Sequence, residues 1–101
     1  MQGSNILICD DHQLFCTGIA EVLKKNQLDV TTCFNSKSCE KLIRNNKFDV
    51  FVCDLNIDGS DGFELISTLK QFLQHTRIII LSAYYEPFLI EKAQKIGVHA
   101  F

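Results

Sequence analysis

Three stretches of the sequence run from apolar residues straight into an oxygen-bearing side chain. They are Asp10 and Asp11 after residues 5–9, Asp54 after residues 50–53, and Ser82 after residues 77–81. An unbroken apolar run is typical of a strand that is buried on both faces, as in a parallel sheet. Because an unpaired charge is costly to bury, packing alone does not explain a carboxylate at such a strand end. Asp54 is therefore a candidate functional residue.

These side chains come together if their strands belong to one sheet. Parallel strands of a doubly wound sheet end at the same edge, and in the order 2-1-3-4-5 the first, third and fourth strands are neighbours. Carboxylates at one place repel each other unless a cation offsets their charge. Mg²⁺ suits this role because it binds one or two carboxylates together with waters and phosphate oxygens. A carboxylate beside Mg²⁺ can attack a phosphoryl group and form an aspartyl phosphate.

The hydrophobic pattern predicts strands and helices in alternation. The predicted strands are 5–9, 28–34, 50–54, 77–81 and the start of a fifth at 98–101, and the predicted helices are 12–26, one capped by Asn35 or Ser36, 60–74 and 87–96. Asp11 is placed to cap the first helix and Gly97 to end the last. This alternation implies right-handed crossovers and an α/β fold with a parallel sheet.

The composition fits one domain. The chain has 101 residues, and 47% of them are apolar, which is enough for a core and too many for a disordered chain. The net charge is −2 with both signs interspersed, so we expect no direct nucleic-acid binding. No apolar run is long enough for a bilayer, and no signal peptide is visible. The 5 cysteines lack a CxxC spacing, so we expect reduced, partly buried thiols in a cytoplasmic protein.

The order and spacing of these motifs resemble the response-regulator receiver domain of bacterial two-component signalling. The matching features are the pair Asp10–Asp11, Asp54 with Asp61–Gly62 in the loop that follows, Ser82–Ala83, and residues 97–101. Residues 10–23 are most similar to the subgroup with a C-terminal helix-turn-helix output domain (LuxR/NarL type). The resemblance covers the whole chain and implies a flavodoxin-like fold with the strand order 2-1-3-4-5, and one receiver domain over residues 1–101.

The resemblance also implies which residues hold the metal. Asp54 would accept the phosphoryl group and contact Mg²⁺. Asp11 would bind Mg²⁺ directly, and Asp10 would bind it largely through water. The backbone carbonyl of Asn56 would be a further ligand.

A second group of residues would bind the phosphoryl group and transmit its effect. Ser82 and the Ala83 backbone N–H would bind its oxygens, and Asn56 and Tyr84 would tune dephosphorylation. Phosphorylation adds about −1.5 to −2 of charge. Ser82 would move toward it, and the ring of Phe101 would enter the vacated space and shift an equilibrium on the face of the fourth helix and fifth strand. The implied partners are a sensor histidine kinase and an output domain, which would bind DNA in the full-length protein.

The sequence departs from the family pattern at two places. Asp58 stands where the family usually has Pro. The family's Lys on strand five, which pairs with the phosphoryl group, would lie three residues beyond Phe101, and the fifth helix would follow it. We therefore expect a C-terminally incomplete receiver domain, truncated in strand five, with impaired phosphorylation and a tendency to form a homodimer through an open sheet edge.

Other interpretations remain open. As a receiver, the chain would be a switch rather than an enzyme, with only self-phosphorylation from small donors and autodephosphorylation. An Asp-nucleophile phosphohydrolase of the haloacid-dehalogenase kind is one alternative, although Asn56 stands where such enzymes carry a second Asp. A non-phosphorylated docking domain is another. Residues 54–59 match half of an EF-hand loop, but Leu65 stands where that loop ends in Glu. Three histidines without ligand spacing are predicted to be ordinary surface or capping residues: His12, His75 and His99.

Overall fold

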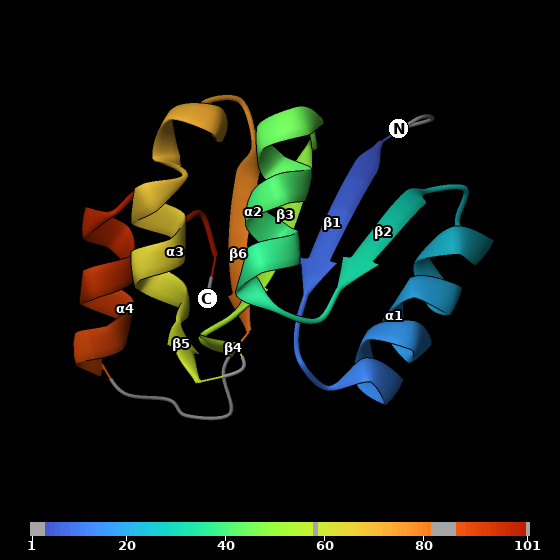
Figure 1. The fold of residues 1–101 in the computed structure, drawn as a ribbon, viewed down its shortest axis with the longest axis horizontal. Coiled ribbons are helices and arrows are strands. Elements are labelled where there is room, and N and C mark those ends of the chain that lie inside the picture. The colour runs from blue at the N-terminus through green and yellow to red at the C-terminus, as the bar shows by residue number, and fades with distance from the viewer. Residues whose placement is uncertain (1–3, 58, 82–86, 101) are drawn as a thin grey trace.

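A parallel four-stranded sheet forms the centre of the domain. The computed structural model describes residues 4–57, 59–81 and 87–100. The strands are, in spatial order, β2 (Asp29–Cys33), β1 (Asn5–Cys9), β3 (Val50–Asp54) and β6 (Arg77–Leu81) (Figure 1). Counted along the chain, this is the order 2-1-3-4, which confirms the predicted doubly wound fold. A parallel bridge between Ile79 and Ala100 lies where the fifth strand was predicted to begin.

Helices cover both faces of this sheet. They are α1 (Gln13–Lys25), α2 (Ser36–Asn45), α3 (Gly62–Thr68), the 3₁₀ helix η1 (Lys70–Phe72) and α4 (Pro87–Lys95). The larger core lies between the sheet and α2, α3 and α4 and includes the fully buried Phe51 and Ile66. A smaller core with Ile8 and Cys16 lies on the opposite face, under α1. No helix in the described ranges is long and apolar enough to cross a membrane.

Two helix ends follow the local sequence as predicted. The Asn35 side chain caps α2 by accepting a hydrogen bond from the Ser38 N–H at 2.8 Å. Gly97 follows the last turn of α4 with a φ of +89°, a left-handed conformation that glycine adopts without steric cost. These two residues therefore set where α2 begins and α4 ends.

Two other predicted ends are wrong. The cap position of α1 is His12 rather than Asp11, because the backbone N–H of His12 donates to the carboxylate of Asp10. The predicted helix at 60–74 is divided into α3 and η1. Its first residues instead form the short strand β5 (Ser60–Asp61), which pairs antiparallel with β4 (Asn56–Ile57). The chain thus makes a hairpin directly after Asp54.

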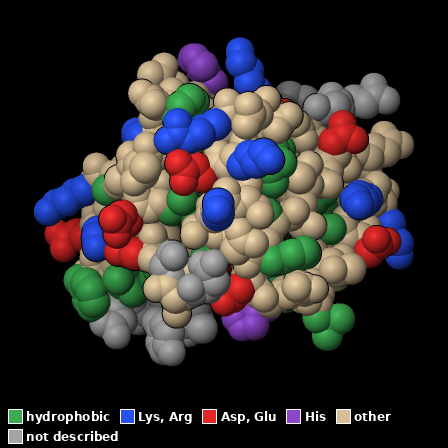
Figure 2. Space-filling view, viewed as in Figure 1, with side chains coloured by type: hydrophobic (Ala, Val, Ile, Leu, Met, Phe, Trp, Pro, Cys, Tyr) green, Lys and Arg blue, Asp and Glu red, His purple; other side chains and the backbone are tan. Residues whose placement is uncertain are grey.

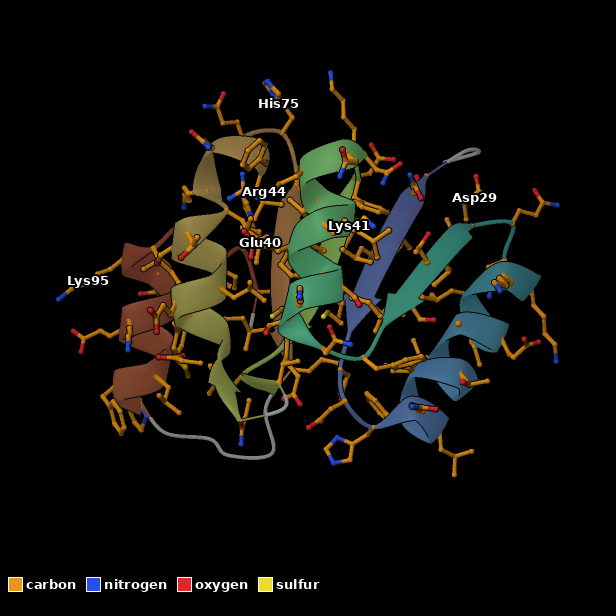
Figure 3. The ribbon with its side chains drawn as sticks, viewed as in Figure 1. Asp29, Glu40, Lys41, Arg44, His75 and Lys95 are labelled. Atoms are coloured by element: carbon orange, nitrogen blue, oxygen red, sulfur yellow. The ribbon has the colours of Figure 1, made fainter. Side chains whose placement is uncertain are left out.

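The surface carries mixed charges. Lys and Arg are interspersed with Asp and Glu on the face in Figure 2, as the net charge of −2 leads one to expect. On α2, the Arg44 guanidinium binds Glu40 at 3.0 Å and lies 5.0 Å from the ring centre of Phe72 in η1 (Figure 3). An exposed pair of this kind contributes only about 0.3–0.5 kcal/mol.

All five cysteines are free thiols, as predicted, but they are buried more deeply than predicted. All of them are buried in the two cores of the domain or beside them: Cys9, Cys16, Cys33, Cys39 and Cys53. Cysteine packs well in such places because it behaves as a small apolar residue.

Candidate functional site

The acidic pair lies directly after β1, at the carboxyl edge of the sheet. The Asp10 N–H donates to the Cys33 carbonyl at 3.1 Å, which extends the β1–β2 ladder and fixes the Asp10 backbone. Asp10 is only 5% exposed, whereas Asp11 is exposed to solvent. The pair therefore offers one buried and one accessible carboxylate.

Asp54 is the last residue of β3, and the register of the sheet brings it next to this pair. Cys9 of β1 pairs with Cys53 of β3, so the residues that follow them, Asp10 and Asp54, are neighbours. Partial burial raises the pKa of Asp54 above its ordinary value, and the charges of Asp10 and Asp11 raise it further. The Asn56 N–H, which donates to Asp54 Oδ1 at 3.3 Å, opposes the rise. Carboxylates that disfavour each other's charge in this way favour a bound cation.

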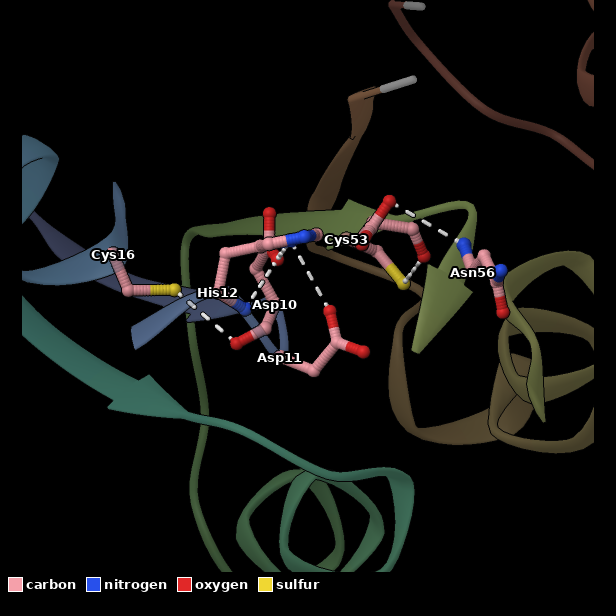
Figure 4. A network of polar contacts seen from close by, with 7 residues as sticks. Asp10, Asp11, His12, Cys16, Cys53 and Asn56 are labelled. Carbon is pink, nitrogen blue, oxygen red and sulfur yellow. Dashed lines mark hydrogen bonds and ion pairs between the residues drawn. The ribbon is translucent and has the colours of Figure 1, made fainter. Parts of the chain in front are cut away.

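The imidazole of His12 joins the carboxylates. Its Nδ1 lies 2.8 Å from Asp10 Oδ1 and 3.2 Å from Asp11 Oδ1 (Figure 4). The hydrogen bond to Asp10 is the main cause that raises the pKa of His12, and the charges of Asp10 and Asp11 add to it. His12 is a surface residue at a helix cap, as predicted, but its contact with the two carboxylates was not predicted. The signal for it is the spacing, because Asp side chains often bind the backbone two residues onward.

Together these residues fit a divalent cation. Asp10, Asp11, His12 and Asp54 each offer one ligand atom, and these atoms lie within 4.8 Å of one another. Three of the four donors are carboxylate oxygens, which hard cations such as Mg²⁺ and Ca²⁺ prefer. The structure therefore brings the three predicted carboxylates into one cluster, whereas Ser82, the hydroxyl predicted to join them, lies outside the described residues.

The loop after Asp54 is held against it by backbone contacts. The Gly62 N–H donates to the Leu55 carbonyl at 2.8 Å. A Cβ on Gly62 would lie 2.5 Å from the backbone oxygen of Asp54, which is closer than real Cβ atoms come. Asp61 accepts a hydrogen bond from the Phe63 N–H at 2.9 Å and caps α3. Glycine is thus needed at position 62 for close approach, and the loop fixes the backbone of Asp54.

Some predicted site residues lie outside the described part of the chain. They are Ser82, Ala83, Tyr84 and Phe101, together with Asp58. Their described neighbours are placed as expected: Leu81 pairs with Asp54 across β3 and β6, and the Ile80 N–H donates to the Ala100 carbonyl at 2.9 Å. Asn56, the remaining predicted ligand, is exposed in β4. The roles of the five undescribed residues stay predictions.

The sequence is similar to a family and to several characterised proteins. The model of the response regulator receiver domain matches residues 6–101. Fimbriae Z protein of Salmonella typhimurium is 29% identical over 103 residues, which cover 100% of this chain and 49% of that protein. Sporulation initiation phosphotransferase F of Bacillus subtilis is 27% identical over 97 residues, which cover 96% and 78%. Transcriptional regulatory protein ComA of Bacillus subtilis is 29% identical over 98 residues, which cover 93% and 46%.

Solved structures of response regulators are similar to this chain in both sequence and fold. A response regulator protein from Burkholderia pseudomallei, crystallised with a phosphorylated aspartic acid, calcium ion and citrate, is 27% identical with a TM-score of 0.91, over 96% of this chain and 57% of that one. The Francisella response regulator 1452 receiver domain is 29% identical with a TM-score of 0.88, over 96% and 80%. The chain spans about half the length of Fimbriae Z protein and ComA.

Proposed function

Because the chain belongs to the response regulator receiver domain family, whose members are phospho-acceptor switches, we propose that it receives a phosphoryl group on Asp54. The observation that carries this proposal is the meeting of Asp10, Asp11 and Asp54 at one edge of the sheet, with ligand atoms within 4.8 Å. Asp54 suits the role of nucleophile because it is only partly buried and its backbone is fixed by the approach of Gly62.

Mg²⁺ is the proposed cation, and when bound it would neutralise charge on the phosphoryl oxygens. Asp11 is accessible, which suits a direct ligand. Asp10 is buried and already accepts two hydrogen bonds from His12, which suits a ligand that acts through water. The carboxylate of Asp54 and the backbone carbonyl of Asn56 complete the proposed set.

Most of the remaining proposed groups follow β6, the strand beside Asp54, or the bridged residue Ala100 in the sequence. Since Asp54 pairs with Leu81, the next residues of the chain are the proposed phosphoryl ligands, the Ser82 hydroxyl and the Ala83 N–H. Phe101, which follows the bridged Ala100, is the proposed switch residue. Asn56 and Tyr84 are the proposed determinants of dephosphorylation rate.

A sensor histidine kinase is the proposed phosphoryl donor, and the cytoplasm is the proposed location. The names of two relatives support an output domain that regulates transcription in the full-length protein, and the second of these names states DNA binding. One is ComA, and the other is the DNA-binding transcriptional activator EvgA of Escherichia coli, which is 28% identical over 98 residues, covering 96% of this chain and 48% of that protein. The homodimer through a sheet edge stays a prediction, which a solution molecular weight tests.

Labelling with acetyl phosphate, followed by intact mass, tests the proposed acceptor. The chain should gain one phosphoryl group when Mg²⁺ is present and none when the metal is chelated. Asp54→Asn should abolish the gain, and the matched control Asp29→Asn, at an exposed residue of β2, should keep it.

The other outcomes separate the alternatives. Continuous release of phosphate without a stable adduct would favour the phosphohydrolase. No adduct on this chain or on a form extended through the family's strand-five Lys would favour a docking domain. An adduct on the extended form alone would support the predicted impairment of phosphorylation and keep Asp54 as the acceptor.

A further inference from the structure

Three thiols meet inside the domain, one residue away from the acidic cluster. The Sγ atoms of Cys9, Cys33 and Cys39 lie within 4.8 Å of one another. Their residues are 0%, 4% and 0% exposed, respectively. The sequence gives no hint of the group, because the spacings between these cysteines match no metal-binding motif.

The fold explains why the thiols meet. Cys9 and Cys33 are paired residues at the ends of the parallel strands β1 and β2, and both belong to the larger core. Helix α2 begins shortly after β2 ends and crosses this face of the sheet. Its first backbone hydrogen bond, from the Cys39 N–H to the Asn35 carbonyl at 3.1 Å, fixes Cys39 above the other two.

The three thiols differ from the two buried cysteines that stand alone. The Cys16 thiol donates to the Asp10 carbonyl at 3.4 Å, and the Cys53 thiol donates to the Asp54 carbonyl at 3.3 Å. The Cys9 thiol likewise donates to a backbone acceptor, the Asn35 carbonyl at 3.7 Å, but its sulfur also lies within 4.8 Å of the Cys33 and Cys39 sulfur atoms. The mutual closeness of three sulfur atoms is therefore what distinguishes the trio from Cys16 and Cys53.

Sulfur donors without oxygen or imidazole select soft cations. A trigonal site with metal–sulfur bonds of about 2.3 Å has sulfur atoms about 4 Å apart. The sulfur atoms of the trio lie no more than 4.8 Å apart, so they need to move by less than about 1 Å to reach this arrangement. Structural Zn²⁺ takes four ligands, and no fourth Cys, His or carboxylate in the described ranges joins the group.

We propose that Cys9, Cys33 and Cys39 form a three-coordinate site for a soft monovalent cation of the Cu(I) class. Each cysteine that binds as a thiolate releases its proton to solvent, and copper supplied as Cu(I) needs no oxidant or reductant. Because the trio is buried, the ion enters when the first turn of α2 opens locally. The site does not depend on phosphorylation of Asp54.

Anaerobic titration of the whole chain with Cu(I), in competition with a chromophoric Cu(I) chelator, tests the proposal. We expect one Cu(I) per chain by native mass spectrometry. Cys39→Ala should weaken binding by about 100-fold or more, because it removes a ligand outright. Cys53→Ala is the matched control, since Cys53 is also 0% exposed, and its affinity should stay within about threefold of the original chain.

Two results would overturn the site. The first is a chain that yields all its Cu(I) to the chelator, and the second is an equal loss in Cys39→Ala and Cys53→Ala. X-ray absorption at the copper edge of the unmodified chain keeps the test decisive if Cys39→Ala does not fold. It should show three sulfur neighbours, whereas nitrogen or oxygen neighbours would place the ion elsewhere.

Discussion

Two clusters of ligand-type side chains begin at consecutive residues of the chain, and they differ in chemistry and in burial. One contains oxygen and imidazole groups and the other contains only thiols: Asp10, Asp11, His12 and Asp54, against Cys9, Cys33 and Cys39. The acidic groups lie at the carboxyl edge of the sheet, where Asp11 and His12 are exposed to solvent, whereas the thiols lie under α2, where isolated charge is costly. The register of one sheet thus assembles both clusters, and burial decides which cation each suits.

The largest expected difference in effect between the two clusters comes from Gly62→Ala, which should weaken the acidic cluster and leave the thiol cluster unchanged. The added Cβ would meet the backbone oxygen of Asp54 at 2.5 Å, so the loop or β3 must shift. We expect a loss of about 2–3 kcal/mol in the free energy of unfolding, measured with urea. Binding of Mg²⁺ and labelling at Asp54 should weaken, whereas Cu(I) binding by the native form should not change.

Gly18→Ala is the matched control for this substitution. Gly18 lies inside α1, and a Cβ there would meet nothing within 4 Å. The change should raise stability by up to about 1 kcal/mol, because alanine favours helices. If both variants lost the same stability, the close approach of Gly62 to Asp54 would not be what limits that position.

Asn35→Ala should disturb the thiol cluster and leave the acidic cluster intact. The Asn35 side chain caps α2 above Cys39, and its loss should cost about 1 kcal/mol in urea unfolding. The first turn of α2 should then open more often, so Cu(I) should exchange faster while Mg²⁺ affinity stays the same. Asn45→Ala, at the exposed end of α2, should change neither the exchange rate of Cu(I) nor the affinity for Mg²⁺. An equally fast exchange of Cu(I) in this variant would contradict entry of the ion through the first turn of α2.

The free energy of unfolding of the chain should rise when the acidic cluster loses a carboxylate. The pKa of Asp54 is raised in the folded chain, so its ionised form destabilises folding above that pKa, and this loss is relieved as the pH falls through it. Asp54→Asn should therefore raise the free energy of unfolding at neutral pH by about 0.5–1 kcal/mol without added metal. Mg²⁺ should stabilise the original chain more than the variant in a thermal melt. A variant less stable than the original chain in metal-free buffer would show that Asp54 contributes favourable contacts instead.

The sequence predicted the acidic cluster better than the thiol cluster for a physical reason. Asp10, Asp11 and Asp54 each follow an apolar strand, and parallel strands bring their ends to one edge whatever their side chains contact. Cys9, Cys33 and Cys39 meet only because a particular register and a helix crossing place them together, and neither can be read from local patterns. The prediction of Asp11 as the helix cap was wrong because the side chain of Asp10 binds the backbone N–H of His12, which is the cap residue, and the apolar pattern does not show such a contact.

The smallest expected effect is the pH dependence that His12 gives to the acidic cluster. Protonated His12 is held by Asp10 and Asp11, which raises its pKa above 6.5, so its contribution to folding is present below 6.5 and is lost as the pH rises through the raised pKa. A divalent cation needs the same carboxylates, and its affinity should therefore increase as the pH rises and His12 loses its proton. Calorimetric titration with Mg²⁺ at about pH 6 and about pH 8 should show this increase in the original chain and a smaller one in His12→Gln. His75→Gln, at an exposed residue at the opposite end of the domain (Figure 3), should retain the full increase, and an unchanged pH dependence in His12→Gln would remove His12 from the metal site.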